Sequence, residues 1–380
     1  MGSSVGGRRD GGVPTERRRI LLVADAASPI VQRWLHHCVA TGYETYIFTC
    51  EPSAPDIPGV HRIRIAPTMR LTGPVKYVAS IPRLRRAVRE INPEIVHSHY
   101  GGGYGLIGAL SGARTLIVSL WGSDVLVAPK RSRIRAAVLR WMLRRAAAVC
   151  VNSQHLARAA SNYTSTPIHL TYFGVEPQFY ASHLGERSDG APLRLAIVKT
   201  FTPNSGIDVL LTALTILRSR GVSVDLVAVG PDPGGRAQQF AHDLGVSGMV
   251  RFVGPAAPAK VAEVLRGRDL YVQPTSFAEG FGIAVVEAQA CGLPAVVTSV
   301  GGLVEAVDPI SGTVVPPQDA GALADAIATF AHDAELLRQS RAQAHVFALA
   351  FRWDEVAPAM NAVYDNLHAS PTIEPRQGPS

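Results

Sequence analysis

Cysteine is scarce in this chain of 380 residues, which contains only Cys38, Cys50, Cys150 and Cys291. No two of them form a C-x-x-C motif, so we expect neither a zinc site nor a disulfide framework, and the low cysteine content is typical of a reducing cytoplasm. Charged residues make up only 18% of the sequence and hydrophobic residues 47%. This composition excludes a disordered or collagen-like chain.

Long apolar runs and targeting signals are also missing. The stretch before Ile20 is charged and has no apolar core of a secretory signal, and no run of 18 purely apolar residues occurs. The two longest uncharged stretches, 95–113 and 288–304, contain glycines and make poor membrane spans. We therefore expect a cytoplasmic protein that at most lies on the inner face of a membrane.

Several catalytic motifs are absent. The sequence has no D-x-D pair, no G-x-x-x-x-G-K phosphate loop, no H-E-x-x-H and no G-x-S-x-G. We therefore predict no metal ion and no cofactor. Because the basic residues are not interleaved with aromatic residues, nucleic acid is not an expected partner.

The charge differs between the two halves of the chain. Residues 1–180 contain 23 Lys and Arg but 10 Asp and Glu, whereas residues 181–380 contain 14 and 20. This asymmetry indicates two domains with different partners. Basic helices expected at 82–91 and 132–147 suit peripheral contact with an anionic membrane, and they equally suit helices with one packed and one solvated face.

Apolar strands and helices alternate in two series. The first runs from Arg19–Asp25 to Ile168–Tyr172, and the second restarts at Leu193–Lys199 after a polar, linker-like stretch. Strands that alternate with helices predict parallel sheets covered by helices. The predicted fold class is therefore α/β, with two Rossmann-like doubly wound domains that face each other across a cleft.

The stretch Ser276–Pro294, SFAEGFGIAVVEAQACGLP, follows a predicted strand and opens a predicted helix. Gly280 and Gly282 allow the backbone to approach a ligand closely, and the free N–H groups at the helix start favour a phosphate. Glu279 and Glu287 would repel a phosphate, so each needs a hydroxylated partner such as a sugar. Together these residues indicate a sugar-nucleotide site, with solvent-facing glutamates as the alternative.

This segment resembles the donor site of retaining glycosyltransferases with the GT-B fold, in the large glycogen-synthase-like family four. The resemblance extends over residues 19–367. It implies that Glu279 contacts the donor sugar and that Glu287 holds the ribose. It also implies that the backbone of Phe281–Ile283 lies near the phosphates or the sugar.

Members of this family often carry an Arg and a Lys that bridge the donor diphosphate. The sequence has Thr200 and Ser205 at these positions, which is a departure from the pattern. We expect the neighbouring Lys199 to supply the positive charge, with the two hydroxyl groups as hydrogen-bonding neighbours; a strand-end lysine in water is the alternative. The departure also keeps open a non-catalytic protein that binds a sugar nucleotide.

Two more strand-end loops resemble the family's nucleotide site. Gly230 is expected to make room near the phosphates or the ribose, and Phe252, Val253 and Gly254 to lie where the base packs. Neither segment identifies the base, so we expect a UDP-sugar or a GDP-sugar as donor.

Family-like segments in the first domain supply candidate acceptor contacts. These are Ser28, His99, Trp121 and Asp124, with packing or helix capping as the alternative for the last three. Family members usually have a histidine at the position of Trp121. The absence of this histidine removes one contact to the donor sugar. The acceptor hydroxyl itself is not identified.

The resemblance divides the chain into five segments. Residues 19–185 are expected to bind the acceptor, and residues 193–353 the nucleotide sugar. Residues 354–368 are expected to form a helix that crosses back to the first domain. A disordered segment, 1–18, and a tail, 369–380, lie at the ends.

The expected activity is metal-independent transfer of a sugar from a nucleotide-diphosphate sugar to a hydroxyl group, with Glu279 and Lys199 as catalytic residues. The resemblance implies retention of anomeric configuration. A rival motif, G-x-G-x-x-G at 103–108 followed by Asp124, would indicate an NAD-dependent oxidoreductase. The motif follows a late strand of its domain, His97 and His99 crowd its entry, and it leaves Glu279 and Glu287 without a function.

Overall fold

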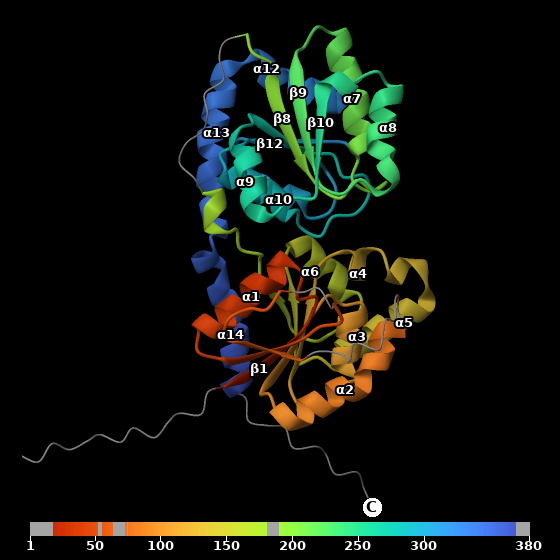
Figure 1. Cartoon of the computed structure of the whole chain (residues 1–380), viewed down its shortest axis with the longest axis vertical. Helices are drawn as coiled ribbons and strands as arrows, with labels where there is room; N and C mark the ends of the chain where they lie inside the picture. The colour runs from red at the N-terminus through yellow and green to blue at the C-terminus, as the bar shows by residue number, and fades with distance from the viewer. Residues whose placement is uncertain (1–17, 52–54, 64–72, 74, 181–189, 370–380) are drawn as a thin grey trace, which may run out of the picture.

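The computed structural model describes residues 18–51, 55–63, 73, 75–180 and 190–369. These residues form two α/β domains that follow one another along the long axis of the molecule (Figure 1). The predicted fold class is therefore confirmed. The expected disordered segment, except residue 18, and the expected tail from residue 370 lie outside the described residues.

The first domain contains a seven-stranded sheet in the order β3-β2-β1-β4-β5-β6-β7, in which every neighbouring pair is parallel. Apolar side chains on alternate faces of β1 enter two separate cores, because successive residues of a strand point to opposite faces. The strands are β1 (Arg19–Val23), β2 (Glu44–Phe48), β3 (Val60–Ile63), β4 (Ile95–His99), β5 (Leu116–Leu120), β6 (Ala148–Val151) and β7 (Ile168–Leu170). The helices are α1 (Pro29–Ala40), α2 (Val75–Ile91), α3 (Gly103–Ala109), α4 (Ser123–Leu126), α5 (Arg133–Leu143) and α6 (Gln154–Ser161).

The second domain contains a six-stranded parallel sheet in the order β10-β9-β8-β11-β12-β13. It too has an apolar core on each face. The strands are β8 (Leu193–Val198), β9 (Val224–Val229), β10 (Val250–Gly254), β11 (Leu270–Gln273), β12 (Ala295–Thr298) and β13 (Thr313–Val315). The helices are α7 (Ile207–Ser219), α8 (Arg236–Asp243), α9 (Pro258–Arg266), α10 (Ile283–Ala290), α11 (Leu303–Ala306), α12 (Ala320–His332) and α13 (Ala334–Ala348).

The last helix, α14 (Trp353–Ala369), lies beside β1 in the first domain although it follows α13 of the second (Figure 1). Met360, Val363 and Tyr364 belong to the core on one face of the first sheet. The Tyr364 hydroxyl lies 2.8 Å from Nδ1 of the buried His97. The chain therefore passes between the domains twice, and the two passages are joined where the Val175 N–H donates to the Phe351 carbonyl at 2.8 Å.

Parallel sheets bind ligands at the carboxyl ends of their strands. The loop after β5 meets the loop after β11 at the boundary between the domains, where a Cβ added to Gly122 would lie 3.3 Å from the Cα of Gly280. The carboxyl ends of the central strands of both sheets therefore converge on one region, which contains the candidate site.

Candidate active site

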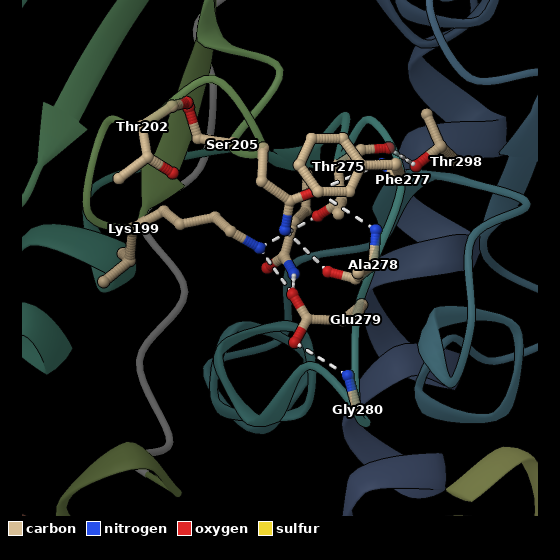
Figure 2. A network of polar contacts seen from close by, with 12 residues as sticks. Lys199, Thr202, Ser205, Thr275, Phe277, Ala278, Glu279, Gly280 and Thr298 are labelled. Atoms are coloured by element: carbon tan, nitrogen blue, oxygen red, sulfur yellow. Dashed lines mark hydrogen bonds and ion pairs between the residues drawn. The ribbon is translucent and has the colours of Figure 1, made fainter. Parts of the chain in front are cut away.

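Lys199 and Glu279 form an ion pair at the carboxyl end of the second sheet (Figure 2). Lys199 follows β8, and its Nζ also donates to Oγ1 of Thr275 at 2.9 Å. Glu279 accepts a second hydrogen bond from Nε2 of Gln273 at 3.1 Å and a third from the Gly280 N–H at 3.2 Å. Both charged side chains keep about a fifth of their surface exposed, 17% for the lysine and 21% for the glutamate. The pair is therefore preorganised and accessible.

Asn204 holds the loop that carries Glu279, and the sequence analysis missed it. Its Oδ1 accepts the N–H groups of Phe277 and Ala278, each at 3.1 Å, and its Nδ2 donates to the Ala278 carbonyl at 2.7 Å. One amide side chain thus satisfies three backbone groups of the loop after β11. Asparagine is suited to this contact because it is both donor and acceptor.

The two expected hydroxyl neighbours of Lys199 differ in their surroundings. Thr200 is exposed. Ser205 is fully buried, and its hydroxyl donates to the Thr202 carbonyl at 2.7 Å and accepts the Ile207 N–H at 3.3 Å. The Ser205 side chain therefore shapes the loop before α7, with no surface left for a ligand.

The remaining donor candidates surround the same strand ends. Gly230 has φ +137°, and a Cβ there would collide with the Lys199 carbonyl, so a side chain would displace the backbone that carries the lysine. Its N–H donates to the Gly254 carbonyl at 2.8 Å, which joins the loops after β9 and β10. Phe252 and Val253 are half-buried. These residues lie together near the carboxyl ends of β9 and β10.

The segment 280–283 connects Glu279 to α10. The Phe281 side chain is buried in the core, with its ring centroid 5.3 Å from that of Tyr172. Gly282 is the N-cap of α10, and Ile283 is its first residue. The first N–H groups of this helix are unpaired within it and can bind an anion.

Glu287 is paired with an arginine from the other domain. Arg33 on α1 approaches its Oε1 at 3.2 Å through Nη2, and donates through Nε to Oε1 of Glu176 at 2.6 Å. The third branch of the guanidinium donates to the Gly174 carbonyl. Burial raises the pKa of Glu287 to about 7, although the arginine opposes this shift. The carboxyl group is therefore poised to titrate near neutral pH.

Asp124 is fully engaged by the backbone. Its carboxylate accepts the N–H groups of Gly101 at 2.7 Å, Gly122 at 2.8 Å and Trp121 at 3.1 Å. The side chain is 3% exposed, and burial raises its pKa against the opposing effect of these hydrogen bonds. Asp124 therefore joins the loops after β4 and β5. This contact with backbone N–H groups is the kind that the alternative of packing or capping describes.

The other acceptor candidates lie at the strand ends of the first domain. His99 is 2% exposed, neither ring nitrogen has a hydrogen-bond partner, and burial lowers its pKa to about 3. The Trp121 ring lies edge-on to the His99 ring, at 5.9 Å between centroids, and its buried Nε1 is also unpartnered. Ser28 is the N-cap of α1, but its side chain makes no capping hydrogen bond.

Contacts across the domain boundary involve the same loops. The Ser153 hydroxyl, at the start of α6, donates to the Gly280 carbonyl at 2.6 Å. Glu305 on α11 accepts the N–H groups of Gln154 and His155, each at 2.7 Å. A carboxylate from one domain thus caps a helix of the other, where the helix dipole favours negative charge.

The glycines at 103–108 pack against protein atoms. A Cβ at Gly103 would collide with the Tyr77 ring, and one at Gly108 with the Ser98 hydroxyl. A Cβ at Gly105 would lie 2.7 Å from the sulfur of Met142. The motif thus serves packing of α3 on its neighbours, and it offers no open phosphate cradle for a dinucleotide.

The fold and this constellation define a class of protein. Two facing Rossmann-like domains, with an accessible Lys–Glu pair and a helix N-terminus at the strand ends of the second, are the arrangement of the GT-B glycosyltransferases. Family models agree: residues 185–346 match the glycosyl transferases group 1 and residues 19–153 match the glycosyl transferase 4-like family. The chain belongs to the group 1, family-four glycosyltransferases, as its sequence motifs predict.

Two curated relatives are named D-inositol 3-phosphate glycosyltransferase. The protein from Mycolicibacterium smegmatis is 40% identical over 176 residues, which are 45% of this chain and 39% of that protein. The protein from Mycobacterium bovis is 29% identical over an alignment that covers 91% of this chain and 83% of that protein. Thus the alignment with higher identity spans less than half of the relative's length.

A solved structure shares the whole architecture. HepE from Anabaena, in complex with UDP and glucose, superposes with a TM-score of 0.74 at 19% identity, over 93% of this chain and all of that one. At this identity the likeness establishes the fold.

No helix in the described part of the chain is both long and apolar enough to cross a membrane.

Proposed function

We propose that this glycosyltransferase moves a sugar from a nucleotide-diphosphate sugar to an acceptor hydroxyl, with retention and without a metal ion. The observation that carries the proposal is the Lys199–Glu279 pair, held by Thr275 and Gln273 beside the N-terminus of α10. This arrangement offers a cation and N–H groups to a diphosphate, and a carboxylate to sugar hydroxyls.

Catalysis in this proposal is mainly electrostatic. Lys199 and the first N–H groups of α10 stabilise the charge that develops on the departing diphosphate. Glu279 binds and orients the donor sugar, and Glu287 binds the ribose. The base lies near Phe252–Gly254, and contact between the domains excludes water from the reacting atoms.

Retention and metal independence are proposed from the resemblance to the family. Among the described residues, no group of three or more His, Cys, Asp or Glu side chains is arranged to hold a metal ion. Glu279 is tied to Lys199 and Gln273, which suits hydrogen bonding to hydroxyls better than nucleophilic attack. Same-face attack, with the leaving phosphate as base, requires no enzyme nucleophile.

The donor and the acceptor are proposed by class. The UDP and glucose in HepE support a UDP-sugar as the first donor to test, with a GDP-sugar as the second. The relatives' printed name supports a phosphorylated polyol as acceptor, and the basic first half of the chain would attract such an anion.

The test is transfer from radiolabelled UDP- and GDP-sugars to a panel that contains inositol and inositol phosphates. Glu279→Gln and Lys199→Met should each lower transfer at least about tenfold, which corresponds to about 1.4 kcal/mol of barrier. Normal transfer by both variants would refute the site. If the wild type binds nucleotide sugar but neither hydrolyses nor transfers it, the non-catalytic alternative holds.

We also propose that α5 contacts an anionic membrane surface. Ile134 is 76% exposed and Val138, one turn later, is 39% exposed. Exposed arginines flank them, at positions 133, 135, 140 and 144. Apolar side chains bordered by cations are typical of interfacial helices. Flotation with phosphatidylglycerol vesicles should recover the wild type and lose Ile134→Glu, whereas neutral vesicles should recover neither.

A further inference from the structure

Arg33 is not among the candidate site residues of the sequence analysis, yet it joins three parts of the molecule. It stands on α1 of the first domain, and its guanidinium contacts Glu176 and Gly174 in the connection between the domains. Its remaining branch reaches Glu287 on α10 of the second domain. Only 11% of its side chain is exposed.

The arrangement contains more negative than positive charge. One buried cation serves two carboxylates, Glu176 at 2.6 Å and Glu287 at 3.2 Å. Removal of the cation leaves two acidic groups close together in a buried place, and one of them will take up a proton. Glu287 can bind two ribose hydroxyls as a carboxylate, but as a neutral acid it has reduced acceptor capacity.

We propose that Arg33 is a positioning residue for the donor: it holds the Glu287 carboxylate in place for the nucleotide ribose, and so makes donor binding depend on a residue of the acceptor domain. This inference rests on the proposed function, in which Glu287 binds the ribose. It adds a cross-domain requirement that a site built only from the second domain would not have.

Other titratable groups near α10 do not replace Arg33. Burial raises the pKa values of Tyr180 on the connection, Tyr271 on β11 and Cys291 after α10, the last to about 12. These groups are therefore neutral below pH 9. Arg266 on α9 donates to the Gln178 carbonyl, and His345 on α13 contacts the Ala290 carbonyl.

The ionisation of Glu287 makes nucleotide affinity depend on pH in a defined direction. Burial raises the pKa of Glu287 to about 7, Arg33 opposes this shift, and Glu176 adds to it. Ribose binding favours the ionised form, so nucleotide affinity should fall as pH drops through 7. Arg33→Met should move this transition to higher pH, and Glu176→Gln should move it to lower pH.

The experiment measures UDP and 2′-deoxy-UDP binding by calorimetry between pH 5.5 and 9, with GDP and 2′-deoxy-GDP if the wild type prefers GDP. The deoxy form corrects for ionisation of the phosphate. At pH 7, Arg33→Met should weaken UDP binding about tenfold, as expected for loss of one charged hydrogen bond. The loss should be smaller at pH 9 and smaller for the 2′-deoxy nucleotide.

A double-mutant cycle separates positioning from general damage. In the Glu287→Gln background, Arg33→Met should have little further effect on UDP affinity. Arg158→Met is the matched control, because it removes an exposed arginine that lies 3.9 Å from Glu305 across the same boundary, and it should bind UDP as the wild type does.

Additive losses in the cycle, or unchanged pH transitions in both Arg33→Met and Glu176→Gln, would overturn the inference. A wild type that binds neither UDP nor GDP would instead refute the proposed function. Thermal melting checks that each variant is folded. If Arg33→Met does not fold, the opposite shift in Glu176→Gln still tests the claim.

Discussion

The two loops that meet at the domain boundary use their acidic residues in opposite ways. In the second domain, Glu279 is partly exposed and pairs with the side chains of Lys199 and Gln273. In the first domain, Asp124 is buried and accepts three backbone N–H groups. Side-chain partners can rearrange when a ligand arrives, whereas the backbone partners of a buried carboxylate are fixed.

This difference assigns separate tasks to the two sides. Charges at the strand ends of the second sheet remain available to a charged ligand, which suits the nucleotide sugar. At the strand ends of the first sheet, the acid is committed to the loops and His99 is neutral. Asp124 and His99 are both buried, so neither side chain is accessible to a ligand as Glu279 is.

The largest effect that the comparison predicts is on stability. Asp124→Ala leaves one buried and two partly buried N–H groups without their acceptor, so the free energy of unfolding should fall by about 3 kcal/mol. Glu279→Gln should change it by about 1 kcal/mol or less, because that pair is partly exposed. Urea denaturation measures both. Equal losses in the two variants would contradict the distinction between fixed and available acids.

A smaller effect is expected from His99 in acid. Its pKa is about 3 in the folded chain and about 6.5 when unfolded, so the unfolded state binds more protons between these values. Stability therefore falls as pH drops below 6.5, and this histidine alone should lower it by about 2 kcal/mol at pH 5 relative to pH 7.

The measurement compares urea denaturation of the wild type and His99→Leu at pH 7 and pH 5. Since neither ring nitrogen has a partner, the substitution breaks no hydrogen bond. The variant should lose about 2 kcal/mol less than the wild type over this interval. An identical loss in both proteins would show that folding does not lower the pKa of His99.

The sequence predicted the parallel sheets because buried strands are continuous apolar runs. It singled out 82–91 as a helical piece, but α2 begins at Val75 and contains Pro82 in its interior. The sequence analysis missed β3 and β13, which are four and three residues long at the edges of their sheets, although it predicted β7, which is equally short and also at an edge. The sequence analysis also did not identify α6, although a helix-start signal was present: Ser153 is its N-cap and accepts the Leu156 N–H.

The sequence could predict only those site residues that lie within a local sequence motif. The stretch around Glu279 has glycines and acids at fixed spacing, and Lys199 ends a recognisable strand. Arg33 and Glu287 are 254 residues apart and on different domains, so their pairing depends on how the domains pack. The role of Asn204 likewise depends on a loop 73 residues further on.

The smallest predicted effect concerns the boundary that brings the two loops together. Glu305 caps α6 through two N–H groups at 2.7 Å, whereas Arg158 is 74% exposed and lies 3.9 Å from the same carboxylate. Glu305→Ala should lower the free energy of unfolding by about 1 kcal/mol, the usual cost of a lost helix cap. Arg158→Ala should change it by less than about 0.5 kcal/mol, because exposed ion pairs contribute little. If urea denaturation gives equal losses in the two variants, charge attraction between Glu305 and Arg158, rather than capping of the helix, holds the loops of the two domains together.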